Sequence, residues 1–183
     1  MFKILSIFNL TFKSRADSKY LKEKLKPMAT ETERKYLVLN DNYKAEAYQS
    51  SLIKQGYLSS HQERTVRVRI MGDKGFLTIK GASDDLGVSR YEWELEIPVP
   101  EAEELLNICE PGTIEKIRYN VHCGNHIFEV DEFLEENLGL VVAEIELLHQ
   151  DESFLRPQWL GLEVTGDLRY YNSALSKNPY SRW

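Results

Sequence analysis

Hydrophobic and charged side chains alternate along most of this chain, which is the pattern of β-strands with two unlike faces. The stretch 64–70 places valine or isoleucine at every second position, with arginine or threonine between them. The stretch 90–97 is purer still, because arginine and glutamate alternate there with tyrosine, tryptophan, leucine and isoleucine. Each stretch is therefore predicted to be a strand with one apolar face and one charged face.

The same alternation recurs at the spacing of hairpin-connected strands. It predicts about eight strands, over residues 31–39, 56–58, 64–70, 76–80, 90–97, 114–121, 127–133 and 140–147. Helices are predicted over 43–54 and 101–109, and short helices beyond Asp151 that end near 167–176. Eight strands joined mostly as antiparallel hairpins are enough to close a barrel.

The composition of the charged faces distinguishes two arrangements of such strands. In an open sheet or sandwich the apolar faces pack inside and the charged faces meet water, which requires no function. That arrangement explains the composition less well, because the charged faces are nearly pure Glu, Asp, Arg and Lys. We therefore expect an α+β fold, mainly β: a closed eight-stranded antiparallel barrel, with the charges around a wet lumen and peripheral helices covering its apolar wall.

Such a lumen would carry charges of both signs. Its cations would be Lys35, Arg67, Arg69, Lys80, Arg90, Lys116 and Arg118. Its carboxylates would be Glu31, Glu33, Glu92, Glu94, Glu96, Glu129, Asp131, Glu144 and Glu146. Unpaired buried charge is costly, so this arrangement requires ligands of both signs. A polyphosphate with a divalent metal supplies both, because arginine and lysine bind phosphate oxygens while carboxylates hold Mg²⁺ or Mn²⁺.

Length, charge and cysteine content narrow the class of protein. The 183 residues suit one domain of ordinary size, and the net charge of −6 argues against broad nucleic-acid binding. Cys109 and Cys123 match no metal-binding spacing and are too few for a disulfide scaffold, so a cytoplasmic location is expected.

The first 27 residues differ from the rest. They carry a net charge of +5, from seven basic and two acidic residues, so the remainder carries −11. Their apolar run is too short to span a bilayer, and no small-residue cleavage site follows it. We interpret 1–27 as a basic extension, or as a stretch upstream of an alternative start at Met28, and 28–183 as the barrel domain.

An ordered set of motifs resembles the CYTH superfamily, the triphosphate tunnel metalloenzymes. The motifs are the E-x-E-x-K of Glu31 to Lys35, the R-x-R of Arg67 and Arg69, the stretch Phe76 to Lys80, the E-x-E of Glu144 and Glu146, and the tail from Thr165 to Asn172. One short charged motif would be weak evidence, whereas the ordered set over roughly residues 30–176 is strong.

The resemblance implies a tunnel that binds a triphosphate and a divalent metal, Mg²⁺ or Mn²⁺, with a C-terminal helix near one mouth. The metal ligands that it implies are Glu31, Glu33, Asp131, Glu144 and Glu146. The substrate ligands that it implies are Lys35, Arg67, Arg69, Lys80, Arg118 and Arg169. Lys116 resembles the lysine with which small bacterial members activate the attacking water; this role needs a neutral amine, favoured where neighbouring cations lower its pKa.

The roles of three lumen residues are left open by the sequence. Arg90 is assigned to the substrate ligands, although an ion-pair lattice with Glu92, Glu94 and Glu96 explains it equally well. Glu129 also fits the neutralisation of Arg118 across strands. Tyr57 is a further candidate to line the tunnel.

The family hosts several chemistries, and the fold does not choose among them. We expect metal-dependent hydrolysis of inorganic triphosphate to diphosphate and phosphate, because the compact chain most resembles small bacterial members. The alternatives are a class IV-type adenylate cyclase, a thiamine or nucleoside triphosphatase, and a non-enzymatic polyphosphate-binding module, which would not need Lys116. The expected partner is a small-molecule triphosphate, with neither nucleic acid nor membrane; a homodimer rests on the resemblance alone.

Overall fold

A computed structural model describes residues 29–84, 86 and 89–183. The strands are β1 (Ala29–Val38), β2 (Ala47–Ser59), β3 (Arg64–Met71), β4 (Lys74–Ser83), β5 (Ser89–Ile97), β6 (Ile114–Cys123), β7 (His126–Phe133), β8 (Val141–Glu146) and β9 (Leu160–Glu163). The α-helices are α2 (Asn42–Glu46), α3 (Val99–Asn107) and α4 (Asn172–Leu175), and the 3₁₀ turns are η1 (Glu135–Asn137), η2 (Leu168–Tyr170) and η3 (Tyr180–Arg182). In these described ranges, no helix has the length and apolar character needed to cross a membrane.

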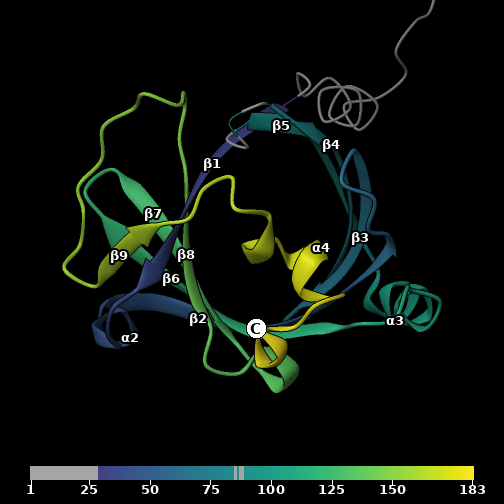
Figure 1. Cartoon of the computed structure of the whole chain (residues 1–183). Helices are drawn as coiled ribbons and strands as arrows, with labels where there is room; N and C mark the ends of the chain where they lie inside the picture. Colours follow the sequence, from purple (N-terminus) through teal and green to yellow (C-terminus); the bar gives the residue numbers. More distant parts are fainter. Residues whose placement is uncertain (1–28, 85, 87–88) are drawn as a thin grey trace, which may run out of the picture.

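The strands close into the predicted barrel. They form one antiparallel sheet in the order β5-β4-β3-β2-β6-β7-β8-β1-β9, and β1 also pairs with β5. This additional pairing closes eight strands into a ring and leaves β9 as an extra strand beside β1. Figure 1 looks into the ring, with α2 and α3 outside it. The prediction of a closed eight-stranded antiparallel barrel with peripheral helices is confirmed.

The helix predicted over 43–54 is wrong beyond its first turn. The helix α2 has five residues, and the chain then continues as β2, the 13-residue strand that also contains the predicted strand 56–58. β2 pairs with β3 on one side and with β6 on the other. The side chains of Ile53, Gln55 and Tyr57 are buried at every second position, which is the period of a strand. Pairing on both edges thus outweighs a local helical pattern.

The region after Asp151 also differs from the prediction. Short helical turns are present there as expected, in η2 and α4, but the strand β9 precedes them. β9 has only four residues and pairs with β1 across an irregular register. A strand of this length is too short for an alternating pattern to reveal it.

A continuous hydrophobic core covers one side of the outer wall. It joins Tyr36 of β1 and Phe128 of β7 to Tyr43 of α2 and to Trp159, all fully buried. The ring of Trp159 lies edge-on to Phe128 at 5.4 Å and to Tyr43 at 6.1 Å, and its Nε1 donates a hydrogen bond to Glu46 at 2.9 Å. This core anchors the strands β1, β6, β7 and β8 from outside.

The opposite side of the wall is less covered. The helix α3 packs against β2, β3 and β4, so closely that a Cβ on Gly75 would lie 2.8 Å from the Cβ of Ala102. Beyond α3, the outward side chains of β4 and β5 are 38–48% exposed, namely Ile79, Tyr91, Trp93 and Leu95. The prediction that helices cover the apolar wall is therefore wrong for this face, as far as the described residues show.

The C-terminal segment closes one end of the barrel. In Figure 1, α4 lies inside the ring of strands. Its Leu175 is fully buried against side chains of the inner wall, in a cluster with Ile114, Phe133, Leu140 and Val142. The predicted C-terminal helix near one mouth is confirmed, and the charged residues lie between this apolar plug and the other mouth.

Candidate active site

The charged faces of the strands point into the barrel, as predicted. Six charged side chains are each at most 8% exposed, namely Lys35, Lys80, Lys116, Arg118, Asp131 and Glu144. Charges this deeply buried are tolerated only with partners of opposite sign. The lumen divides into an acidic half, on β1, β6, β7 and β8, and a basic half, on β3, β4 and β5.

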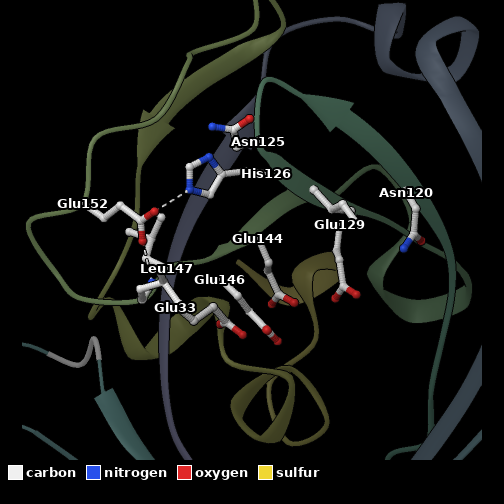
Figure 2. A pocket seen from close by; sticks show the side chains of 11 residues that line it. Glu33, Asn120, Asn125, His126, Glu129, Glu144, Glu146, Leu147 and Glu152 are labelled. Carbon is white, nitrogen blue, oxygen red and sulfur yellow. Dashed lines mark hydrogen bonds and ion pairs between the residues drawn. The ribbon is translucent and has the colours of Figure 1, made fainter.

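In the acidic half, the strand register sets carboxylates directly opposite one another. Glu33 of β1 faces Glu146 of β8, and Glu129 of β7 faces Glu144 of β8. Figure 2 shows these four carboxylates pointing toward one shared space. Like charges at directly opposed positions destabilise a sheet, so this half of the lumen needs cations.

Two cations of the protein already lie among these carboxylates. The ammonium of Lys35 contacts both Glu33 and Glu144. Burial alone would lower the pKa of Lys35, but Glu144 and Glu33 more than offset it and raise the pKa. Arg118 pairs with Glu129 and Glu144, and places two nitrogens on Asp131 at 2.6 and 2.7 Å. The alternative that Glu129 neutralises Arg118 is thus confirmed as a contact.

The acidic half opens into a cavity of about 660 Å³, lined by Glu33, Glu129, Glu144 and Glu146 and, nearer the rim, by Asn120, Asn125, His126, Ile127, Leu147, Leu148 and Glu152. His126 and Glu152 pair at the rim, with 3.0 Å between Nε2 and Oε1 (Figure 2). Glu152 also accepts a hydrogen bond from the backbone of Leu148 at 2.5 Å. This pair ties the loop after β8 to β7 and shapes the mouth.

The acidic half suits a divalent metal by donor chemistry, although its side chains are not arranged as a metal centre. Within the described residues, no three His, Cys, Asp or Glu side chains are grouped to hold an ion. The ammonium of Lys35 stands between Glu33 and Glu144, where a cation is needed. Both carboxylate oxygens of Asp131 accept hydrogen bonds from Arg118. Carboxylate oxygens of this kind are the ligands that Mg²⁺ and Mn²⁺ prefer.

Glu31, another predicted metal ligand, belongs to β1 and is paired in register with Arg90 of β5. Its side chain lies outside the described part of the structure.

The basic half has fewer carboxylates than cations. Arg67 and Arg69 share one carboxylate, Glu94, at 3.4 and 3.0 Å. The Nε atoms of both arginines are buried, and neither has a hydrogen-bond partner among the described residues. Burial, reinforced by the charge of Arg67, lowers the pKa of Arg69 to about 10. Spare donors on adjacent arginines are what a phosphate group would satisfy.

Cations from both halves meet at a small pocket of about 30 Å³, lined by Lys35, Tyr57, Thr65, Arg67, Lys80, Arg90, Tyr171, Asn172 and Ser173. We call it the phosphate pocket. Lys80 also pairs with Glu92 at 2.5 Å, so Glu92 takes part in an ion pair, as the alternative reading of the β5 charges expected. Glu96, by contrast, is 58% exposed and pairs with Lys74 outside the pocket. The structure thus brings Arg90 and Tyr57 to the cations that the sequence predicted.

Lys116 belongs to β6 in the acidic half and is 1% exposed. Its Nζ contacts Asp131, donates a hydrogen bond to Asn172 Oδ1 at 3.4 Å and lies 5.4 Å from the centre of the Phe133 ring. Burial lowers the pKa of Lys116 to about 8; the charge of Arg118 acts in the same direction and that of Asp131 opposes it. The lowered pKa follows the prediction, but burial contributes more than the neighbouring cations do.

The structure does not bring Arg169 to this site. Its side chain is 64% exposed, pairs with Asp167 at 2.7 Å and packs 5.5 Å from the centre of the Trp183 ring. The turn η2 begins at Asp167, whose side chain accepts hydrogen bonds from both the backbone and the guanidinium of Arg169, and these local bonds keep the guanidinium at the exposed surface. The assignment of Arg169 as a substrate ligand therefore has no support in the geometry.

Sequence reasoning missed Tyr171, Asn172 and Thr65 as residues of the phosphate pocket. None of them carries a charge, so the alternation of charged and apolar residues could not reveal them. The position of Asn172 at the end of the C-terminal motif was the one available signal.

Comparisons with known proteins find similar sequences and a similar fold. The profile of the CYTH domain family matches residues 29–177. A curated protein from Acetivibrio thermocellus, named inorganic triphosphatase, is 50% identical over 157 residues, which cover 85% of this chain and 99% of that protein. Another from Nitrosomonas europaea, with the same name, is 35% identical over 151 residues, covering 80% and 97%. A crystal structure of an inorganic triphosphatase has a TM-score of 0.58 and 33% identity, covering 81% of this chain and 95% of that one.

Proposed function

The chain belongs to the CYTH domain family, and from this premise we propose that it hydrolyses inorganic triphosphate to diphosphate and phosphate in the barrel lumen. Both curated relatives carry the name of that activity, at 50% and 35% identity. The observation that carries the proposal is the separation of charge inside the barrel: opposed carboxylates on one side and arginines with spare donors on the other.

A triphosphate with a divalent cation would relieve both imbalances at once. The polyanion would take the unpaired donors of Arg67 and Arg69. Its binding set would be completed by the other cations of the lumen, namely Lys35, Lys80, Arg90 and Arg118. Arginine forks hold phosphate oxygens in a defined orientation, so this set would also position the scissile bond.

Metal dependence is part of the proposal. Glu33, Glu144 and Glu146 would hold Mg²⁺ or Mn²⁺, with Glu31 contributing from the start of β1. Asp131, already shared by Lys116 and Arg118, would act beside them by keeping these two cations in place. When bound, the cation supplies charge neutralisation at phosphate oxygens.

Lys116 would activate the attacking water. A pKa of about 8 leaves part of the amine neutral near neutral pH, as a general base requires. The water oxygen would form a bond to the terminal phosphorus and give its proton to Nζ of Lys116. The bridging P–O bond would break in line with this attack, and diphosphate would leave with the bonding electron pair.

The test is phosphate release by the purified full chain, supplied separately with tripolyphosphate, ATP and thiamine triphosphate, with Mg²⁺, Mn²⁺ or EDTA. We expect metal-dependent release that is fastest with tripolyphosphate. Tight binding of tripolyphosphate without any turnover would replace this proposal with a binding module. Cyclic AMP formed from ATP would replace it with a cyclase.

One observation favours a second candidate, the hydrolysis of a triphosphate ester. The cavity of about 660 Å³ continues beyond the carboxylates toward Asn120, Ile127 and Leu148, which leaves room for an organic group. Faster release from thiamine triphosphate or ATP than from tripolyphosphate would establish this candidate.

We also propose a cytoplasmic location, supported by the free thiols of Cys109 and Cys123. The division into an extension, 1–27, and a tunnel domain, 28–183, remains a proposal, supported by a family match that begins at residue 29.

A further inference from the structure

The closed end of the lumen is built by a segment that the charge pattern did not reveal. Tyr171, Asn172 and Ser173 line the phosphate pocket together with cations from β1, β3 and β4. Nζ of Lys35 lies 6.0 Å from the centre of the Tyr171 ring. Because these residues precede and begin α4, the C-terminal segment is a wall of the proposed catalytic chamber rather than an external appendage.

The position of Asn172 is held from both sides along the chain. After it, Leu175 is fully buried in the apolar plug of the barrel. Further on, the backbone of Tyr180 donates a hydrogen bond to Asn137 Oδ1 at 2.9 Å. Before it, the backbone of Val164 donates to the carbonyl of Lys35 at 2.9 Å. A side chain held between such anchors can define the position of a neighbouring group.

Lys116 needs such a neighbour. Its carboxylate partner Asp131 is shared with two nitrogens of Arg118, so Asp131 alone does not determine where the amine points. Asn172 Oδ1 accepts a hydrogen bond from Lys116 Nζ at 3.4 Å and comes from a different element. An amide oxygen adds no charge, whereas a carboxylate in its place would repel the phosphates of a substrate.

We propose that Asn172 is a positioning residue for the hydrolysis: its amide oxygen fixes the Lys116 amine at the edge of the phosphate pocket, where the attacking water would lie. This inference rests on the proposed function and assigns to Asn172 an action through Lys116 alone.

Two substitutions separate the hydrogen bond from the shape of the side chain. Asn172→Leu keeps a similar volume and removes the acceptor, and it should lower kcat by about 10-fold to 100-fold with KM nearly unchanged. Asn172→Gln keeps an uncharged amide acceptor on a longer side chain and should recover part of kcat, with KM nearly unchanged. A raised KM with normal kcat in Asn172→Leu would make Asn172 a substrate ligand and overturn the proposal.

A double-mutant cycle with Lys116→Ala tests whether Asn172 acts through Lys116. We expect Lys116→Ala and the double variant Lys116→Ala/Asn172→Leu to have the same kcat. If Asn172→Leu lowers kcat by the same factor in Lys116→Ala as in the unaltered protein, the proposal is contradicted, because Asn172 would then act independently of Lys116.

Asn137→Leu is the matched control, since Asn137 anchors the same C-terminal segment but is not among the described residues that line the phosphate pocket. It should lower the thermal unfolding temperature and change kcat little, because Leu175 and the hydrogen bond from Val164 still hold the segment that carries Asn172. Asn172→Leu should lower kcat and change the unfolding temperature little. A loss of kcat in Asn137→Leu as large as in Asn172→Leu would reduce Asn172 to a structural role. If the unaltered chain does not hydrolyse triphosphate, the proposed function fails; if it does and Asn172→Leu is fully active, only this inference fails.

Discussion

The two halves of the lumen hold their charges in different ways. In the acidic half, Lys116 and Arg118 both form ion pairs with Asp131, and the side chains of Lys116 and Asp131 are only 1% exposed. In the basic half, Arg67 and Arg69 share Glu94, which is 29% exposed, and each keeps a buried nitrogen without a partner in the described residues. The buried cations of the acidic half are therefore all paired with its more numerous carboxylates, whereas the arginines of the basic half keep hydrogen-bonding capacity for a ligand.

This difference indicates what each half contributes. Breaking a buried ion pair leaves an uncompensated charge, so the acidic half should be sensitive in stability as well as in activity. Removing one of two adjacent arginines relieves repulsion, so the basic half should lose substrate affinity without losing stability. The predictions below test that contrast.

The largest effect is expected for Lys116→Ala in the acidic half. Loss of the general base should lower kcat by about 10²-fold to 10⁴-fold and change KM much less. Steady-state kinetics with tripolyphosphate measure both constants, with Lys54→Ala on the exposed side of β2 as control. A loss of affinity alone would make Lys116 a phosphate ligand.

Asp131→Asn should show the sensitivity of the acidic half. It removes the shared carboxylate of Lys116 and Arg118, and we expect it to lower the free energy of unfolding by about 3–5 kcal/mol. Glu94→Gln in the basic half should cost less than about 1 kcal/mol, since Glu94 is partly exposed. Chemical denaturation compares the two, and equal losses would remove the distinction between the halves.

Arg67→Ala should show the opposite profile. Losing a charged hydrogen-bond donor to phosphate should raise KM by about 10-fold to 100-fold. The unfolding midpoint of Arg67→Ala should equal or exceed that of the unaltered protein, because the charge repulsion between Arg67 and Arg69 is removed. Arg34→Ala, which removes an arginine paired with Glu163 outside the lumen, is the control. A destabilised Arg67→Ala with unchanged KM would assign Arg67 to the fold.

Glu33→Gln should weaken metal binding with little change in shape. Activity should fall at low Mg²⁺ or Mn²⁺ and recover in part when the metal concentration is raised. Metal titrations of the variant and of Glu163→Gln, whose carboxylate lies outside the lumen, provide the comparison. The same fractional loss at every metal concentration would count against Glu33 as a ligand.

The smallest effect concerns the ion pair of Arg34 and Glu163 on the outer wall. The hydrogen bond from Arg34 lowers the pKa of Glu163 in the folded protein. The ion pair therefore contributes to stability above the unfolded pKa of about 4.3, and this contribution is lost as the pH falls through the lower folded pKa. Because Glu163 is 36% exposed, Glu163→Gln should cost well under about 1 kcal/mol near pH 7. Thermal unfolding should show the cost disappearing toward about pH 3, and a cost that grows on acidification would refute it.

Much of the fold and of the charged site could be predicted from local patterns. The alternation over 64–70 and 90–97 has the period of a strand, and that period assigns each charged residue to a face without knowledge of the partner strand. All eight predicted strands coincide with observed strands, although 56–58 is only the end of β2, and the cations and carboxylates share the lumen. The C-terminal turn was predicted less well, because Tyr171 and Asn172 enter the site through shape and neutral polar groups.

The sequence by itself determined the strand periodicity, the inward charges and the family, because each depends on residue types at short spacings. The tertiary structure alone decided which charges meet. Residues 47–54 became a strand because β3 and β6 pair with both edges of β2. Glu33 opposes Glu146, and Asn172 reaches Lys116, because barrel closure and the C-terminal plug bring together residues more than 50 positions apart. Arg169, in the right motif, was turned outward by a local cap. Register and closure are long-range properties, and no local pattern specifies them.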